Sequence, residues 1–278
     1  MKNIFYIALL LSLILIGCSQ EEVSMPIKEE GSDNKVEPTI ETKEDVQAGS
    51  TESGSKEEIE EVNVEQREAE YKVNQSNWLI EPTGTANDQV VLLTIDDAPQ
   101  QYALEMAKTL DNLGVKAIFF VNGHFIDTEE EAKILKEIYD LGFPIGNHTY
   151  SHHSLKDLTE EEQYDQIVSL NNRIKEIIGE KPKFFRAPFG ANTEYSKKVV
   201  EQEKMVLMNW TYGYDWEKDF QTKESLVDIM VNTPLLMKGA NLLMHDREWT
   251  NAALEDIVKG LRAKGFEIVD PGLIETPK

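Results

Sequence analysis

The chain of 278 residues carries 51 acidic and 28 basic side chains, which gives a formal net charge of −23 at pH 7. A nucleic-acid-binding face requires a basic patch, so this composition argues against nucleic acid as a partner and against a strongly anionic substrate. Cys18 is the only cysteine, which excludes an internal disulfide and a metal site made of several cysteines.

The first 18 residues are typical of an export signal. Lys2 precedes an apolar run over residues 4–16, which is too short for the roughly 20 residues that cross a bilayer. The run ends in the sequence LIGC, which resembles the lipobox of bacterial lipoproteins, where the cysteine is lipidated. We therefore expect a signal peptide over 1–18 and an extracytoplasmic protein that Cys18 anchors to the bacterial cell membrane.

Residues 19–75 lack the composition of a folded domain. Acidic residues outnumber basic ones by 17 to 6, and Ser, Thr, Gly and Pro are scattered between them. Low hydrophobicity combined with like charge leaves such a segment disordered. We expect an acidic tether over 19–75 and a single folded domain over 76–278.

From residue 90 onward, short apolar runs alternate with amphipathic helical stretches. The expected strands are 90–95, 117–121, 143–147, 183–187, 205–210, 240–245 and 266–270. The expected helices are 100–113, 129–140, 160–178, 192–203, 223–232 and 250–264. Because each helix returns the chain to the same edge, this order predicts an α/β fold with a parallel sheet. Both an open doubly wound sheet and a barrel fit this length; we prefer a distorted parallel (β/α) barrel with about seven strands. No Gly-rich phosphate loop follows the first strand, which argues against a nucleotide-binding protein.

Charged and imidazole side chains gather where the expected strands end. In a barrel, the C-terminal ends of the strands carry the active site. The set offers a carboxylate and two imidazoles for a metal, and a second carboxylate, an arginine and a third imidazole for proton transfer. The side chains at these strand ends, from which such a site would be drawn, are Asp96, Asp97, His148, His152, His153, Arg186, Asp215 and His245.

Five short motifs between residues 90 and 269 resemble, in order, those of polysaccharide deacetylases of the NodB-homology type, carbohydrate esterase family four. TIDDAP is similar to the family's T-F-D-D-G-P, HTYSH to H-S/T-x-x-H, RAPFG to R-x-P-F/Y-G, YDW to the end of D-x-x-D-W, and LMH to L-x-H. The resemblance implies a distorted parallel barrel. It also implies removal of N-acetyl, sometimes O-acetyl, groups from chitin, peptidoglycan or related polysaccharides.

The same resemblance implies a role for each matching residue. One divalent metal, zinc with cobalt or nickel as alternatives, would be held by Asp97, His148 and His152. Asp96 would be the general base, oriented by Arg186, and His245 the general acid, kept charged by Asp215. The backbone N–H of Phe189 would stabilise the oxyanion, and Trp216 and Leu243 would wall the acetyl pocket.

The spacing of the histidines favours the same pair. If residues 148–152 form a helical turn, an i,i+4 pair points both imidazoles the same way, whereas an i,i+5 pair diverges. We therefore expect His148 and His152 to be ligands and His153 to point elsewhere. His124, after the second strand, matches no motif and is expected at the rim.

Three departures from the family pattern leave questions open. Ala98 stands where glycine is usual, Tyr212 where the first Asp of D-x-x-D-W is expected, and Phe189 where tyrosine is common. Alternatives to a deacetylase are an inactive glycan-binding lipoprotein, an O-acetyl esterase of the same fold, and a small-molecule hydrolase of the same superfamily. We expect a monomer. Residue patterns do not identify the polymer.

Overall fold

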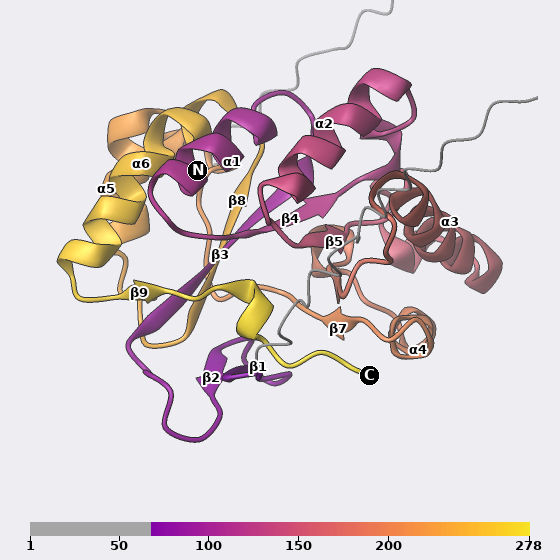
Figure 1. Ribbon diagram of the computed structural model, residues 1–278, viewed down its shortest axis with the longest axis horizontal. Helices are drawn as coiled ribbons and strands as arrows, with labels where there is room; N and C mark the ends of the chain where they lie inside the picture. The colour runs from indigo at the N-terminus through magenta and orange to yellow at the C-terminus, as the bar shows by residue number, and fades with distance from the viewer. Residues whose placement is uncertain (1–67) are drawn as a thin grey trace, which may run out of the picture. The chain divides into compact units, whose positions relative to one another are not determined.

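The computed structural model describes residues 68–278 (Figure 1). The expected signal peptide, the lipidation site Cys18 and the tether up to residue 67 lie outside the described residues. Across the described part of the chain, no helix has both the length and the apolar character that crossing a membrane requires.

A curled parallel sheet forms the centre of the described domain. Its strands are β3 (Val90–Ala98), β4 (Ile118–Val121), β5 (Ile145–Asn147), β6 (Phe184–Phe185), β7 (Val206–Leu207), β8 (Ala240–His245) and β9 (Glu267–Ile268). Within residues 68–278 the order is β7-β6-β5-β4-β3-β8, with β9 also paired to β3, and every pair is parallel. Beyond β7, a parallel bridge joins Tyr212 to Leu242 of β8. The two ends of the sheet thus approach each other, which confirms the distorted, incompletely closed barrel.

Helices fall between the strands as the periodicity predicted. They are α1 (Ala103–Asn112), α2 (Glu129–Asp140), α3 (Glu160–Ile178), α4 (Glu194–Gln202), α5 (Lys223–Asn232) and α6 (Glu248–Ala263). A capping box opens α3, where Thr159 and Glu162 exchange hydrogen bonds with each other's backbone N–H. Helix α1 starts three residues later than expected, because the buried carboxylate of Asp246 binds the N–H groups of Gln101 and Tyr102.

Strand β3 separates two apolar layers. Val91, Leu93 and Ile95 belong to the cluster shared with the surrounding helices, whereas Val90 and Leu92 belong to a cluster inside the curled sheet. This alternation follows from the period of two along a strand. It places the next inner positions, Thr94 and Asp96, inside the curl at the carboxyl end of β3.

A small antiparallel hairpin, which the sequence analysis missed, precedes the sheet. Strand β1 (Tyr71–Val73) pairs with β2 (Ile80–Pro82), and Tyr71 also forms a bridge with Ile274. Tyr71, Val73 and Ile80 pack into the inner cluster, and Figure 1 shows the hairpin beside the C-terminal segment. The folded part therefore begins before the expected boundary at 76. Along β1, Tyr71 and Val73 are buried while Lys72 between them is exposed, so this short strand packs onto the core.

Candidate active site

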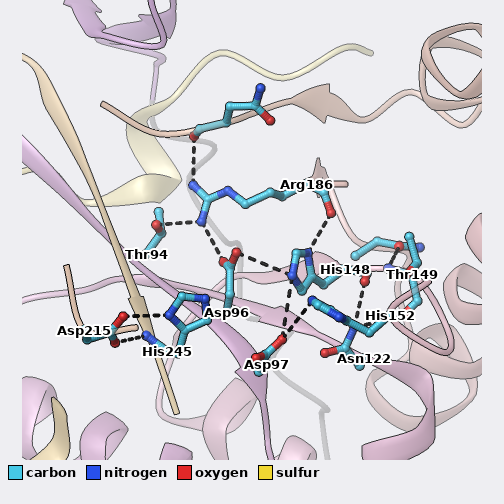
Figure 2. Close-up of polar contacts among 12 residues, drawn as sticks. Thr94, Asp96, Asp97, Asn122, His148, Thr149, His152, Arg186, Asp215 and His245 are labelled. Atoms are coloured by element: carbon cyan, nitrogen blue, oxygen red, sulfur yellow. Dashed lines mark hydrogen bonds and ion pairs between the residues drawn. The ribbon is translucent and has the colours of Figure 1, made fainter. Parts of the chain in front are cut away.

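Asp96 and Asp97 both reach the site although they are consecutive in one strand. Regular alternation would send them to opposite faces of the sheet. The pairing of β3 with β4 shifts register between Ile95 and Ala98, and Asp97 has a left-handed φ of 59°. This irregularity turns the Asp97 carboxylate toward the side of the sheet that carries Asp96 (Figure 2). Ala98 is itself part of β3, so alanine fits where glycine was expected.

Asp97, His148 and His152 form a compact group of possible metal ligands. One ligand atom from each lies within 4.8 Å of the others. The Oδ1 atom of Asp97 is 3.3 Å from Nε2 of His152 and 3.8 Å from Nε2 of His148. The structure thus brings together the three residues that the motifs indicated.

The structural reason given for this pair from spacing was wrong. Residues 148–152 form a loop rather than a helical turn, with left-handed φ angles of 67° at Thr149 and 56° at His152. The side-chain oxygen of Asn147 accepts the N–H of Thr149, and the amide of Asn122 donates to the carbonyls of His148 and Thr149. These buried amides, rather than a helix, hold the loop in the conformation that turns both rings inward.

The other two histidines of the loops lie outside this group. His153 is exposed and does not join the cluster, in line with the expectation. His124 is also exposed. Its Nδ1 lies 3.0 Å from the carbonyl oxygen of Tyr150, and its ring centroid lies 4.0 Å from the ring centroid of Phe125.

The donor set fits a divalent cation such as zinc. Nδ1 of His148 lies 2.7 Å from the carbonyl oxygen of Arg186, which requires the proton on Nδ1 and leaves the Nε2 lone pair toward Asp97. Burial lowers the pKa of His148 to about 3 and also lowers the pKa of His152, so both rings are neutral. Among the described residues, the buried Oδ1 of Asp97 has no hydrogen-bond partner. A cation would satisfy this oxygen and both imidazoles.

Arg186 is fully buried and organises the second carboxylate. Its guanidinium donates to Oδ1 of Asp96 at 2.6 Å, to the hydroxyl of Thr94 at 2.8 Å and to the carbonyl of Asn209 at 2.9 Å. It also lies 4.3 Å from the centre of the Phe120 ring. Gly146 on β5 makes this packing possible, since a Cβ there would lie 2.5 Å from the ring of Phe120. The sheet therefore fixes the position of the Phe120 ring, against which the guanidinium of this ion pair packs.

Asp96 has the environment of a general base. Burial raises the pKa of its carboxyl group, while the charge and hydrogen bond of Arg186 act in the opposite direction. Oδ1 is engaged by Arg186, and Oδ2 faces the ligand cluster, 3.5 Å from Nε2 of His148. One carboxylate oxygen is thus anchored by Arg186, and the other faces the group of possible metal ligands.

His245 and Asp215 form a separate pair beside Asp96, since His245 on β8 is the register partner of Asp96 on β3. The Asp215 carboxylate, 0% exposed, accepts from Nδ1 of His245 at 2.7 Å, from its backbone N–H at 2.6 Å and from the hydroxyl of Thr250 at 2.8 Å. Burial alone would lower the pKa of His245, but its hydrogen bond and charge interaction with Asp215, together with the carboxylates of Asp96 and Asp97, raise it. The pair has the features of a general acid.

Tyr212, which replaces the family's first aspartate, points away from this pair. Its ring is buried and its hydroxyl donates to the carbonyl of Met230 in α5. The presence of tyrosine instead of aspartate at position 212 therefore leaves the contacts between Asp215 and His245 intact.

Aromatic rings flank the two functional groups. Phe189 is 69% exposed and packs edge-on against His152, with 4.9 Å between the ring centroids. Trp216 is 44% exposed and packs edge-on against His245, with 5.5 Å between the ring centroids. Leu243 is buried next to Gly213. A Cβ at Gly213 would lie 2.4 Å from the carbonyl oxygen of Leu243 and 2.7 Å from the Trp216 ring, so glycine allows this close packing. The sequence analysis missed Gly213; its position just before the YDW motif was the available signal.

Arg247 is a second residue that the sequence analysis missed. Its Nη2 lies 3.0 Å from Oδ2 of Asp97, so it contacts a candidate ligand directly. No motif pointed to it; its place two residues after His245 was the only signal.

Comparison with known proteins identifies the family of this domain. A family model described as polysaccharide deacetylase matches residues 83–208. A peptidoglycan-N-acetylglucosamine deacetylase of Bacillus cereus is 30% identical over 206 residues, which cover 70% of this chain and 72% of that protein.

Solved structures show the same fold. The Bc1960 peptidoglycan N-acetylglucosamine deacetylase matches with a TM-score of 0.61 at 28% identity, over 70% of this chain and 92% of that one. A carbohydrate esterase family 4 pseudoenzyme from Bacillus anthracis matches with a TM-score of 0.59 at 28% identity, over 66% and 63% of the two chains. The shared fold, the extent of the match to the Bacillus cereus enzyme and the five motifs lead to one conclusion: this chain belongs to the polysaccharide deacetylase family, carbohydrate esterase family 4.

Proposed function

We propose that this protein is a metal-dependent hydrolase that removes N-acetyl groups from an N-acetylglucosamine-containing polysaccharide, peptidoglycan or a chitin-like polymer, at the cell envelope. The observation that carries the proposal is the cluster of Asp97, His148 and His152, in which Oδ1 of Asp97 has no hydrogen-bond partner among the described residues. Asp96 contacts this cluster, and His245 is the register partner of Asp96 on the adjacent strand. The two peptidoglycan deacetylases among the compared proteins support the choice of substrate class.

Asp97, His148 and His152 would hold one zinc ion, with cobalt or nickel as alternatives. Imidazole nitrogen and carboxylate oxygen suit zinc, and three protein ligands leave a position for water. Bound there, the ion would polarise the acetyl carbonyl and acidify the water.

Asp96 would take a proton from the attacking water through Oδ2, because Oδ1 is already held by Arg186. The backbone N–H of Phe189 is our candidate donor to the oxyanion. Trp216 and Leu243 would wall the acetyl group. His245 would then donate its proton to the nitrogen of the leaving amine, with Asp215 stabilising the charged imidazole before transfer.

Two other functions are alternatives to the N-acetyl deacetylase. The first is an inactive glycan-binding protein, because a compared structure of this family is described as a pseudoenzyme. In this chain the proposed base, ligands and acid are all present and lie together, which favours an enzyme. An O-acetyl esterase would use the same groups on an ester.

A panel of acetate-release assays tests the proposal. We expect the zinc-loaded protein to release acetate from N-acetylglucosamine oligomers or peptidoglycan and not from acetylated xylan. Release from xylan alone would indicate the esterase. Binding to these polymers without acetate from any of them would identify the inactive glycan-binding protein.

Substitution of the ligands should remove the metal. Asp97→Asn, His148→Ala and His152→Ala should each lose stoichiometric zinc, measured by elemental analysis, together with acetate release. His153→Ala is the matched control, because its exposed ring lies outside the cluster. Loss of zinc in His153→Ala with retention in His152→Ala would show that the pair was chosen wrongly.

The acid can be separated from the metal site. His245→Ala should keep stoichiometric zinc and lose turnover by about 10²–10⁴-fold. Asp215 raises the pKa of His245, so Asp215→Asn should shift the alkaline limb of the pH–rate profile to lower pH while zinc stays bound.

Tyr212→Phe is the control for this experiment and should keep the wild-type profile, since its hydroxyl contacts Met230 rather than Asp215. Loss of zinc in His245→Ala would contradict the assignment of His245 as the acid.

The cellular location is part of the proposal. We infer a lipid anchor at Cys18 that holds the enzyme on the outer face of the bacterial cell membrane, and a monomeric protein. Cys18→Ser should release the protein from the membrane fraction and leave acetate release by the folded domain unchanged. Fractionation of that variant with lipid in the absence of other proteins would refute the anchor.

A further inference from the structure

Arg247 holds the oxygen of Asp97 that does not face the histidines. We propose that Arg247 is a positioning residue, which fixes the Asp97 carboxylate so that only Oδ1 is offered to the metal. Nη2 of Arg247 lies 3.0 Å from Oδ2, whereas Oδ1 faces His152 at 3.3 Å and His148 at 3.8 Å. The inference rests on the proposed function, because it assumes that a metal binds to this cluster.

The Asp97 carboxylate needs such a partner. Its backbone lies at the register shift of β3 in a left-handed conformation, so no regular strand geometry sets the direction of the side chain. Among the described residues, Oδ1 has no hydrogen-bond donor. The contact with Arg247 is therefore what determines which oxygen faces the cluster.

Arg247 is itself held in place by the same edge of the sheet. Nη1 donates to the side-chain oxygen of Gln100, and the neighbouring Asp246 carboxylate binds the N–H groups of Gln101 and Tyr102. These hydrogen bonds thus join the loop after β3 to the loop after β8. A planar guanidinium can bind Gln100 and Asp97 together, which a lysine ammonium cannot do with the same geometry.

Two opposite effects of Arg247 on metal affinity have to be weighed. Its charge repels a divalent cation, which would weaken binding, while its hydrogen bond orients a ligand, which would strengthen binding. The Arg247 side chain is 34% exposed, so solvent screens the repulsion. Residues that orient ligands typically change metal affinity by about 10–100-fold. We therefore expect orientation to dominate.

The experiment uses the full-length protein freed of metal with a chelator and titrated with zinc against a fluorescent competitor. Arg247→Met should raise the zinc Kd by about 10–100-fold, and Arg247→Lys by a smaller factor, because the ammonium can still donate one hydrogen bond to Oδ2 of Asp97 but lacks the planar fork. Arg262→Met is the matched control and should bind zinc as the wild type does, because Arg262 lies in the last turn of α6 and donates to the carbonyl of Leu113.

Cobalt absorption spectra test the geometry as well as the affinity. With Arg247 removed, Oδ2 of Asp97 becomes available as an additional ligand. Arg247→Met loaded with Co²⁺ should therefore show weaker visible bands, as a higher coordination number produces, while Arg262→Met keeps the wild-type spectrum. Helix α6 has no side-chain cap at Arg247, so the substitution removes no helix cap.

The outcomes separate this inference from the proposed function. An unchanged zinc Kd and cobalt spectrum in both Arg247 variants, or tighter zinc binding in Arg247→Met, would overturn the positioning role while the metal site stands. A wild-type protein that binds neither Zn²⁺ nor Co²⁺ would overturn the proposed metal dependence and this inference with it.

Discussion

The ion pair between Arg186 and Asp96 is the interaction on which the rest of the site depends. The two side chains are 0% and 3% exposed, and neither charge could remain buried without the other. The guanidinium also binds Thr94 and the carbonyl of Asn209, while the carbonyl of Arg186 itself accepts from His148. One residue after β6 therefore sets the positions of the proposed base and of a proposed ligand.

Most of the fold could be predicted from the sequence, because the central strands are continuous apolar runs and the helices carry clear apolar faces. The seven strands of the sheet appear where the runs predicted them. The hairpin of β1 and β2 could not be foreseen in the same way. Three residues of alternation, next to a long acidic segment, give too short a pattern, and the burial of Tyr71 depends on Ile274, some 200 residues away.

The residue types of the site could also be predicted, but not its local geometry. The spacing of His148 and His152 pointed to the pair that the structure groups with Asp97, but the argument assumed a helical turn that the structure does not contain. Glycine is the main signal of a positive φ in a sequence. Here Asp97 adopts a positive φ at a register shift, and His152 adopts it in a loop that buried amides hold. Arg247 had no signal beyond its place two residues after His245, since its contact with Asp97 exists only once the loops after β3 and β8 meet.

The same geometry bears on whether the protein is an enzyme or an inactive glycan binder. Among residues 68–278, six non-glycine residues have positive φ, and four of them, Asp97, Thr149, His152 and Phe189, lie at the site. Such conformations cost about 1–3 kcal/mol each, and a buried carboxylate oxygen without a partner adds to the cost. Stacking of a sugar on Phe189 or Trp216 requires no left-handed Asp97 or His152. A ligand set held ready for a cation does require it, and this is the physical reason to prefer the enzyme.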